Sequence, residues 1–73
     1  MRAKIKILFK NEEALQDLVQ TLERIGVEYL FFLGKIEFYV NGIAANEYTI
    51  SLGTDKNINV YVRPEDIKEF ELK

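Results

Sequence analysis

The sequence predicts an α+β fold in a single domain over residues 1–73, with a mostly antiparallel sheet of about five strands and one amphipathic helix packed on one face. Two patterns lead to this prediction. Apolar and polar residues alternate in several short segments, which is typical of strands with one buried face. Between Glu12 and Ile25 the apolar residues recur at helical spacing instead. The predicted element order is β-α-β-β-β-β, followed by a short C-terminal turn and edge strand.

The first strand and the helix have the clearest signals. Alternate positions of residues 3–9 are apolar, which predicts a half-buried strand. Asn11 is a good helix N-cap, and two acidic residues follow it in the first turn, where the helix dipole favours negative charge. Gly26 follows the last apolar position and suits a left-handed C-terminal cap. We therefore expect a helix over residues 12–25.

Two glycine-containing dipeptides after the helix predict tight hairpins. The apolar residues of segment 27–40 change from odd to even positions around Gly34-Lys35, which fits a two-residue hairpin loop. Asn41-Gly42 is the strongest short hairpin signal and predicts a second such turn. The strands would then pair in one antiparallel meander, with the strand of residues 3–9 as a neighbour in the same sheet.

The last third of the chain predicts three further features. A shift in alternation near residues 45–47 predicts a β-bulge. Residues 58–62 alternate again and predict a strand, which ends at Pro64 because proline cannot donate a hydrogen bond to a sheet. One helical turn over residues 64–68 and a short edge strand ending near Lys73 complete the predicted fold.

The predicted register brings apolar side chains together on the sheet face that the single helix cannot cover. Leu30 would lie opposite Tyr39, and Tyr39 opposite Ala44, while Phe32 would lie opposite Glu37. Exposed apolar patches often mark interaction surfaces, and aromatic residues are enriched in protein interfaces. The alternative is that the C-terminal segment folds back and buries the patch. The predicted interface residues are Leu8, Leu30, Phe32, Tyr39, Ala44 and Tyr61.

The size and composition of the chain favour association. Domains below about 70–80 residues often rely on disulfides, metals or oligomerisation for stability. This chain has 73 residues and neither Cys nor His, so disulfides and the usual zinc, copper and iron ligands are missing. We therefore expect a noncatalytic protein-binding module that is homodimeric through its apolar sheet face or a strand edge. A small inhibitor or adaptor that regulates a larger protein complex would have these features.

A second interpretation uses the same face for single-stranded nucleic acid. Aromatic side chains on a sheet can stack unpaired bases while surrounding cations meet the phosphates. Ten basic residues against twelve acidic ones disfavour this interpretation, as do the glutamates expected on the same face. A small-molecule-binding regulatory domain is a further alternative. The candidate nucleic-acid residues are Lys4, Lys6, Lys35, Tyr39, Tyr61 and Arg63.

The chain lacks the side chains of most catalytic sites. Histidine, the commonest general base, and cysteine are absent, and Ser51 has no basic residue close to it in sequence. The four glycines each stand at a predicted turn and form no phosphate-binding cluster. We therefore expect no enzyme activity and no catalytic, cofactor or metal site.

The hydropathy pattern also bears on location. No apolar run approaches the roughly 20 residues of a membrane span. The first residues lead into strand-like alternation and lack the apolar core of a signal peptide. We therefore expect a cytoplasmic protein that has no membrane partner.

Overall fold

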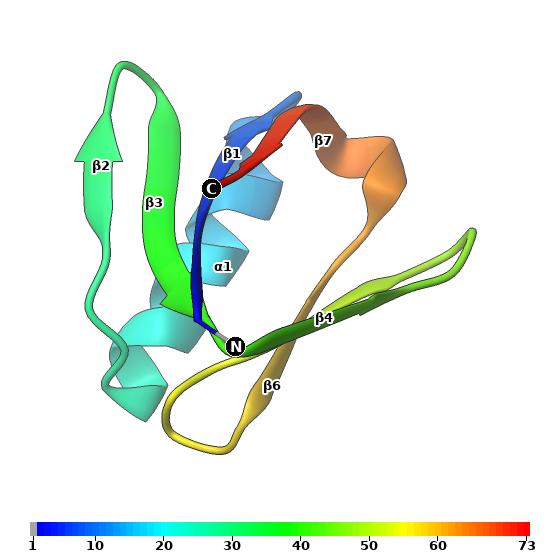
Figure 1. The fold of residues 1–73 in the computed structure, drawn as a ribbon. Helices are drawn as coiled ribbons and strands as arrows, with labels where there is room; N and C mark the ends of the chain where they lie inside the picture. The colour runs from blue at the N-terminus through cyan, green and yellow to red at the C-terminus, as the bar shows by residue number, and fades with distance from the viewer. Residues whose placement is uncertain (1) are drawn as a thin grey trace.

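The computed structural model describes residues 2–73, which form one helix and seven strands in two antiparallel sheets (Figure 1). The α+β class is confirmed. The single sheet of about five strands is wrong, because the strands divide into a sheet of four and a sheet of three. The observed order is β-α-β-β-β-β-β-β, with a 3-10 turn before the last strand.

The four-stranded sheet joins the two ends of the chain. Its order is β2-β3-β1-β7. β1 lies in the middle and pairs with β3 on one side and with β7 on the other. The predicted turn and edge strand at the C-terminal end are therefore confirmed, and β7 extends the sheet without folding over its outer face. The four strands are β1 (Ala3–Phe9), β2 (Leu30–Phe32), β3 (Lys35–Val40) and β7 (Ile67–Leu72).

The three-stranded sheet consists of β4 (Gly42–Ala45), β5 (Ile50–Gly53) and β6 (Asn59–Val62). The hairpin predicted at Asn41-Gly42 is wrong, because β3 pairs with β1 and β2, whereas β4 pairs with β5. At Asn41 the chain instead passes from one sheet to the other, and the Asn41 N–H donates to the carbonyl of Gly53 at 2.7 Å.

The bulge predicted near residues 45–47 is also wrong. Ala45 pairs directly with Ile50, so residues 46–49 form the loop of the β4–β5 hairpin. The side-chain oxygen of Asn46 accepts from the backbone N–H groups of Tyr48 and Thr49 at 2.7 and 2.8 Å. An asparagine side chain that accepts from backbone N–H groups two and three residues later stabilises a turn. A turn and a bulge both change the alternation of apolar residues, so the sequence pattern does not distinguish them.

The helix α1 (Glu12–Ile25) has the predicted bounds and caps. The side-chain oxygen of Asn11 accepts from the N–H of Ala14 at 2.7 Å. Gly26 has a left-handed backbone with φ of 78°, and its N–H donates to the carbonyl of Glu23. Both ends of the helix thus supply partners for backbone groups that the helix itself leaves unpaired.

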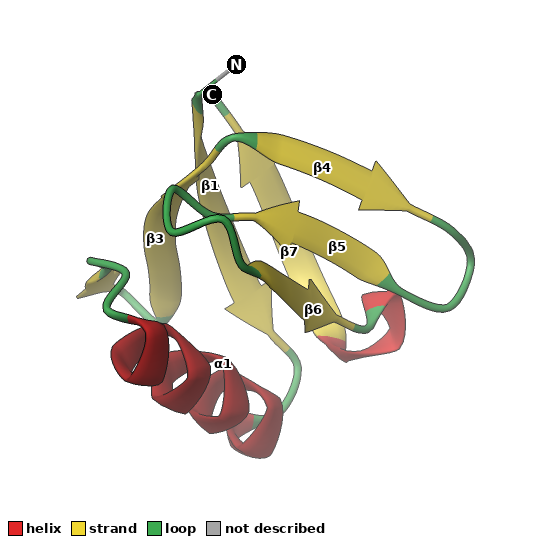
Figure 2. Cartoon of the chain, turned by 90° about the horizontal axis from the view of Figure 1, so that it is seen from below, coloured by secondary structure: helices red, strands yellow, loops and turns green. Residues whose placement is uncertain are grey.

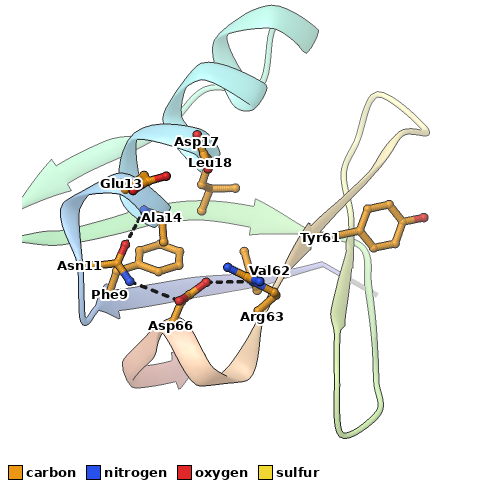
Figure 3. Close-up of a pocket in the computed structure, with 10 residues that line it drawn as sticks. All are labelled: Phe9, Asn11, Glu13, Ala14, Asp17, Leu18, Tyr61, Val62, Arg63 and Asp66. Atoms are coloured by element: carbon orange, nitrogen blue, oxygen red, sulfur yellow. Dashed lines mark hydrogen bonds and ion pairs between the residues drawn. The ribbon is translucent and has the colours of Figure 1, made fainter.

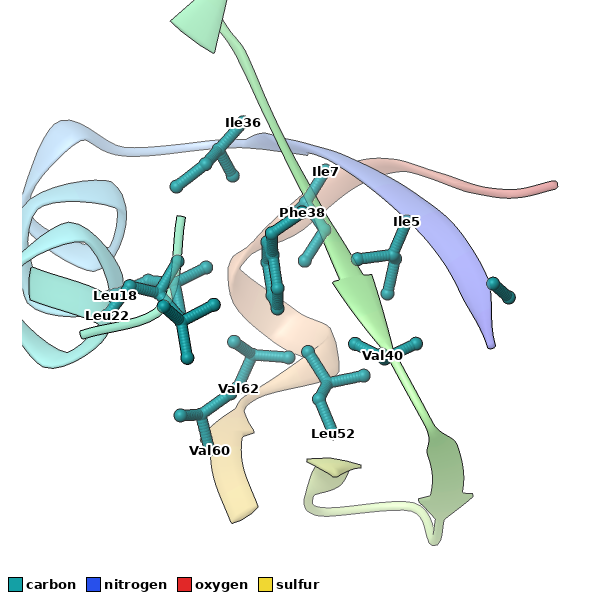
Figure 4. Close-up of a cluster of buried hydrophobic side chains, with 12 residues drawn as sticks. Ile5, Ile7, Leu18, Leu22, Ile36, Phe38, Val40, Leu52, Val60 and Val62 are labelled. Carbon is teal, nitrogen blue, oxygen red and sulfur yellow. The ribbon is translucent and has the colours of Figure 1, made fainter. Parts of the chain in front are cut away.

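One core lies between the inner faces of the two sheets and α1 (Figures 2 and 4). In Figure 2 the three-stranded sheet lies in front of β1 and β7, and α1 runs along one side. Burial of this apolar surface is the main stabilising contribution to a domain of this size. The buried side chains are Ala3, Ile5, Ile7, Leu18, Leu22, Val27, Ile36, Phe38, Val40, Leu52, Val60 and Val62.

Candidate protein-binding surface

The β2–β3 hairpin turns one residue earlier than predicted. Phe32 pairs with Lys35, so the loop is Leu33-Gly34. Both loop residues have positive φ, 54° and 78°, which is the backbone of a type I′ turn. The change of alternation alone placed the loop at Gly34-Lys35, and a leucine at positive φ is uncommon enough that nothing in the sequence favoured Leu33 as a loop residue. The correct register puts Leu30 opposite Glu37, so the predicted pairing of Leu30 with Tyr39 is wrong.

Four of the six predicted interface residues share the outer face of the four-stranded sheet, the side turned away from the core. Directly paired antiparallel residues point to the same side. Leu30 and Phe32 therefore point outward with Glu37 and Lys35, their partners in β3. Leu8 points to the same side because it pairs with Lys35, and Tyr39 does so because it lies two residues after Glu37 and pairs with Lys4. The four predicted interface residues on this face are Leu8, Leu30, Phe32 and Tyr39.

Ala44 and Tyr61 do not belong to this surface. Ala44 pairs with Ser51, and Ser51 pairs with Tyr61, so the three side chains share the outer face of the other sheet. Tyr39 pairs with Lys4 and lies in a different sheet from Ala44. The prediction of one contiguous patch is wrong because it assumed that β3 and β4 form a hairpin.

The outstanding feature of the outer surface is the β2 edge, which we define as residues 30–33. β2 is an edge strand of the four-stranded sheet. All four residues of the β2 edge are apolar and more than half exposed. Their exposed fractions are 66% for Leu30, 54% for Phe31, 67% for Phe32 and 80% for Leu33.

The sequence missed two residues of the β2 edge. Val27, Tyr29, Phe31 and Leu33 occupy alternate positions, and this pattern predicts that Phe31 and Leu33 point to the inner side of the sheet and contribute to the core. Phe31 does point to that side, because its partner is the buried Ile36. The core ends before it reaches β2, however, and Leu33 lies in the turn. A run of four large apolar residues directly before a glycine turn was the only sequence signal that could have indicated an exposed hairpin end.

A shallow apolar pocket lies beside β2. β2 pairs with β3 only over Lys35–Glu37, so β3 extends past the end of its neighbour. The space next to the uncovered part of β3 has a volume of about 230 Å³. It continues the apolar surface from Leu30 to Tyr39. Its lining residues are Lys4, Glu28, Tyr29, Leu30, Glu37, Phe38 and Tyr39.

Two of the lysines on the outer face are paired with carboxylates. Lys4 Nζ lies 3.3 Å from Glu37 Oε1, and Lys35 Nζ lies 3.1 Å from Glu69 Oε2. The guanidinium of Arg2 lies over the ring of Tyr39 at 4.1 Å. Exposed ion pairs of this kind contribute only about 0–1 kcal/mol to stability. They do reduce the positive charge that this face offers to phosphate groups.

The predicted nucleic-acid residues are divided in the same way as the predicted interface. Lys4, Lys6, Lys35 and Tyr39 share the outer face of the four-stranded sheet. Tyr61 lies on the other sheet, and Arg63, just after β6, pairs with acidic residues at 3.4 and 3.2 Å. The structure therefore does not bring the six residues together on one surface.

A second, polar pocket of about 390 Å³ lies between the N-terminal end of α1, the end of β6 and the 3-10 turn η1 (Pro64–Asp66) (Figure 3). Asp66 accepts from Asn11 Nδ2 at 3.2 Å and from Arg63 Nε at 3.2 Å. This network ties η1 to the start of the helix. Because Asn11 and Arg63 both donate to Asp66, the polar groups on this side of the pocket have a structural role.

No protein-family model matches the chain, and no curated protein or solved structure matches it. Within residues 2–73, no group of three or more acidic, His or Cys side chains is arranged to hold a metal ion. The same part of the chain contains no helix that is both long and apolar enough to cross a membrane.

Proposed function

We propose that the chain is a noncatalytic protein-binding module that forms a homodimer through the β2 edge of its four-stranded sheet. The observation that supports this most is the exposure of four consecutive apolar residues, three on an edge strand and one in the turn that follows it. Soluble domains seldom leave a contiguous apolar surface uncovered unless it binds something.

The energetic gain from covering this surface is large for a domain of 73 residues. An aromatic side chain can bury 150–250 Å², so Phe31 and Phe32 each leave roughly 100 Å² uncovered. At about 25 cal/mol per Å², covering each ring would contribute about 2.5 kcal/mol. Small domains have few other means of stabilisation, and this one has no cysteine to form a disulfide.

The dimer would leave the polar face of α1 free. That face carries Glu12, Gln16 and Glu23, and it suits contact with a further protein. In this form the chain would act as a small inhibitor or adaptor in a larger complex. Single-stranded nucleic acid is less well supported, because Lys4 and Lys35 already pair with carboxylates.

The test is the molar mass of two charged variants in solution. Phe32→Lys places a charge in the proposed interface and should yield a folded monomer of 8.5 kDa. Tyr48→Lys changes an aromatic side chain that is 73% exposed at the β4–β5 loop, and it should stay dimeric. Circular dichroism controls for folding. If Phe32→Lys remains a folded dimer, the β2 edge is not the interface.

A further inference from the structure

We infer that two copies of the chain associate edge to edge, with β2 of one copy pairing antiparallel with β2 of the other about a two-fold axis at Phe31. The two four-stranded sheets would then join into one continuous sheet. This inference rests on the proposed homodimer and specifies its geometry. Addition of a strand to an exposed sheet edge is a recurring mode of protein recognition.

The backbone of β2 is oriented for this pairing. In a two-residue hairpin the residues that flank the loop form a hydrogen-bonded pair, and hydrogen-bonded and non-hydrogen-bonded pairs then alternate along the strands. Phe32 and Lys35 flank the loop, so the next pair, Phe31 with Ile36, is not hydrogen-bonded. The N–H and C=O of Phe31 therefore point away from β3, toward the free edge.

The β2 edge also lacks the usual protection against strand pairing. Edge strands are commonly guarded by charged side chains. β7, the opposite edge of the same sheet, has three charged residues among its six, Lys68, Glu69 and Glu71. β2 consists of Leu30, Phe31 and Phe32 and carries no charge.

Edge pairing accounts for the exposed residues better than face-to-face packing of the two sheets does. Face-to-face packing would press Lys6, Glu37 and the other charged residues of the outer face against the partner, and burying charges is costly. It would also leave Phe31 uncovered, because that ring points to the other side of the sheet. Edge pairing covers Phe31 and Phe32 together and leaves the charges in water.

The β2 edge is complementary to itself. With the axis at Phe31, the two Phe31 rings would lie side by side, and Leu30 of each copy would lie opposite Phe32 of the other. Pairs of aromatic and aliphatic residues across neighbouring strands are favourable. The exposed surface of residues 30–33 amounts to roughly 500 Å² per copy. Edge pairing covers only part of it, so the two copies would bury less than about 1,000 Å² of this surface, which is the range of weak, reversible interfaces.

Amide hydrogen exchange of the unmodified protein tests this geometry. The Phe31 N–H should exchange at least tenfold more slowly at a concentration where the dimer is populated than in a dilute, monomeric sample. The N–H of Phe70 is the matched control. Lys4 and Lys73 form a hydrogen-bonded pair, because each backbone N–H donates to the other's carbonyl. Hydrogen-bonded and non-hydrogen-bonded pairs alternate along β1 and β7, so the pair of Ile7 with Phe70 is not hydrogen-bonded and the Phe70 N–H points to the free edge of β7. Its exchange should not depend on concentration.

Disulfide cross-linking supplies a second measurement, because the chain has no cysteine of its own. Across the axis, the Cα atoms of a hydrogen-bonded pair are about 5.5 Å apart, within disulfide range. Phe31→Cys should therefore cross-link at least tenfold faster than Phe70→Cys. Leu30→Cys should cross-link more slowly than Phe31→Cys, since the Cα atoms of the two copies' residue 30 would be about 8 Å apart, outside disulfide range.

The outcomes separate this inference from the proposed function on which it rests. A dimer in which the Phe31 N–H stays unprotected and Phe31→Cys cross-links no faster than Phe70→Cys would overturn edge pairing but leave the homodimer intact. Faster cross-linking of Leu30→Cys than of Phe31→Cys would overturn the position of the axis. A chain that is monomeric at every concentration would overturn both proposals.

Discussion

Phe31 pairs directly with Ile36, yet Ile36 is completely buried whereas Phe31 is 54% exposed. Neighbouring strands are only about 4.8 Å apart, so the core ends abruptly between β3 and β2. α1 and the three-stranded sheet cover the inner face of β1 and β3 but do not reach the edge strand. The result is a short strand that is exposed on both of its faces, and this exposure underlies both proposals.

The same pair of residues predicts a contrast in stability. Ile36→Ala should lower the free energy of unfolding by about 2–5 kcal/mol, because it opens a cavity in the core. Phe31→Ser should cost about 2 kcal/mol or less in a dilute, monomeric sample, since more than half of the residue is in water already and the exposed site leaves no closed cavity. Urea denaturation measures both values. Equal losses for the two variants would mean that Phe31 belongs to the core.

The N-cap of α1 provides a second prediction. Asn11 accepts from the Ala14 N–H and donates to Asp66, so Asn11→Ala loses both the cap and the link to η1. We expect a loss of about 1–2 kcal/mol in the free energy of unfolding. Gln20→Ala, an exposed position on the same helix, should change stability by less than about 0.5 kcal/mol. Similar small values for both variants would contradict the capping role.

The type I′ turn provides a third prediction. Leu33→Asn should stabilise the protein by about 0.5–1 kcal/mol in a dilute, monomeric sample, because asparagine tolerates the positive φ that leucine adopts there with strain. Gly34→Ala should destabilise the protein by about 1 kcal/mol, since glycine adopts the φ of 78° at this position without steric cost. Thermal unfolding measures both. A destabilising Leu33→Asn would mean that the leucine makes contacts in the monomer that outweigh the strain.

Binding to nucleic acid can be tested in a single titration. A fluorescent single-stranded oligonucleotide at low salt should show no saturable binding, because Lys4, Lys35 and Arg63 all pair with carboxylates. Saturable binding that Lys4→Glu abolishes would contradict this prediction and favour the nucleic-acid interpretation of the outer face. Since Arg63 lies away from that face, Arg63→Glu serves as the comparison variant.

Features that depend on nearby residues could be predicted from the sequence. The helix follows from Asn11, Gly26 and the helical spacing between them, and its bounds are as predicted. β1 follows from alternation, which also places Leu30 and Phe32 on the outer face. Each of these signals is contained in a few consecutive residues.

Long-range pairing could not be predicted in the same way. Val40 pairs with Ala3, which is far from it in the sequence. Nothing in Asn41-Gly42 shows that the chain passes there to a second sheet. The candidate surface was therefore predicted only in part. Alternation determines the side of the sheet to which Phe31 points. It does not determine how far the core extends on that side, and the exposure of Phe31 depends on that extent.

The molar mass of the unmodified protein, measured by light scattering over a wide range of concentration, tests the central claim most directly. For the proposed homodimer, the mass should rise from 8.5 kDa toward twice that value as the concentration increases. A mass that stays at 8.5 kDa up to the highest concentration would contradict the homodimer and leave the exposed β2 edge without its proposed partner.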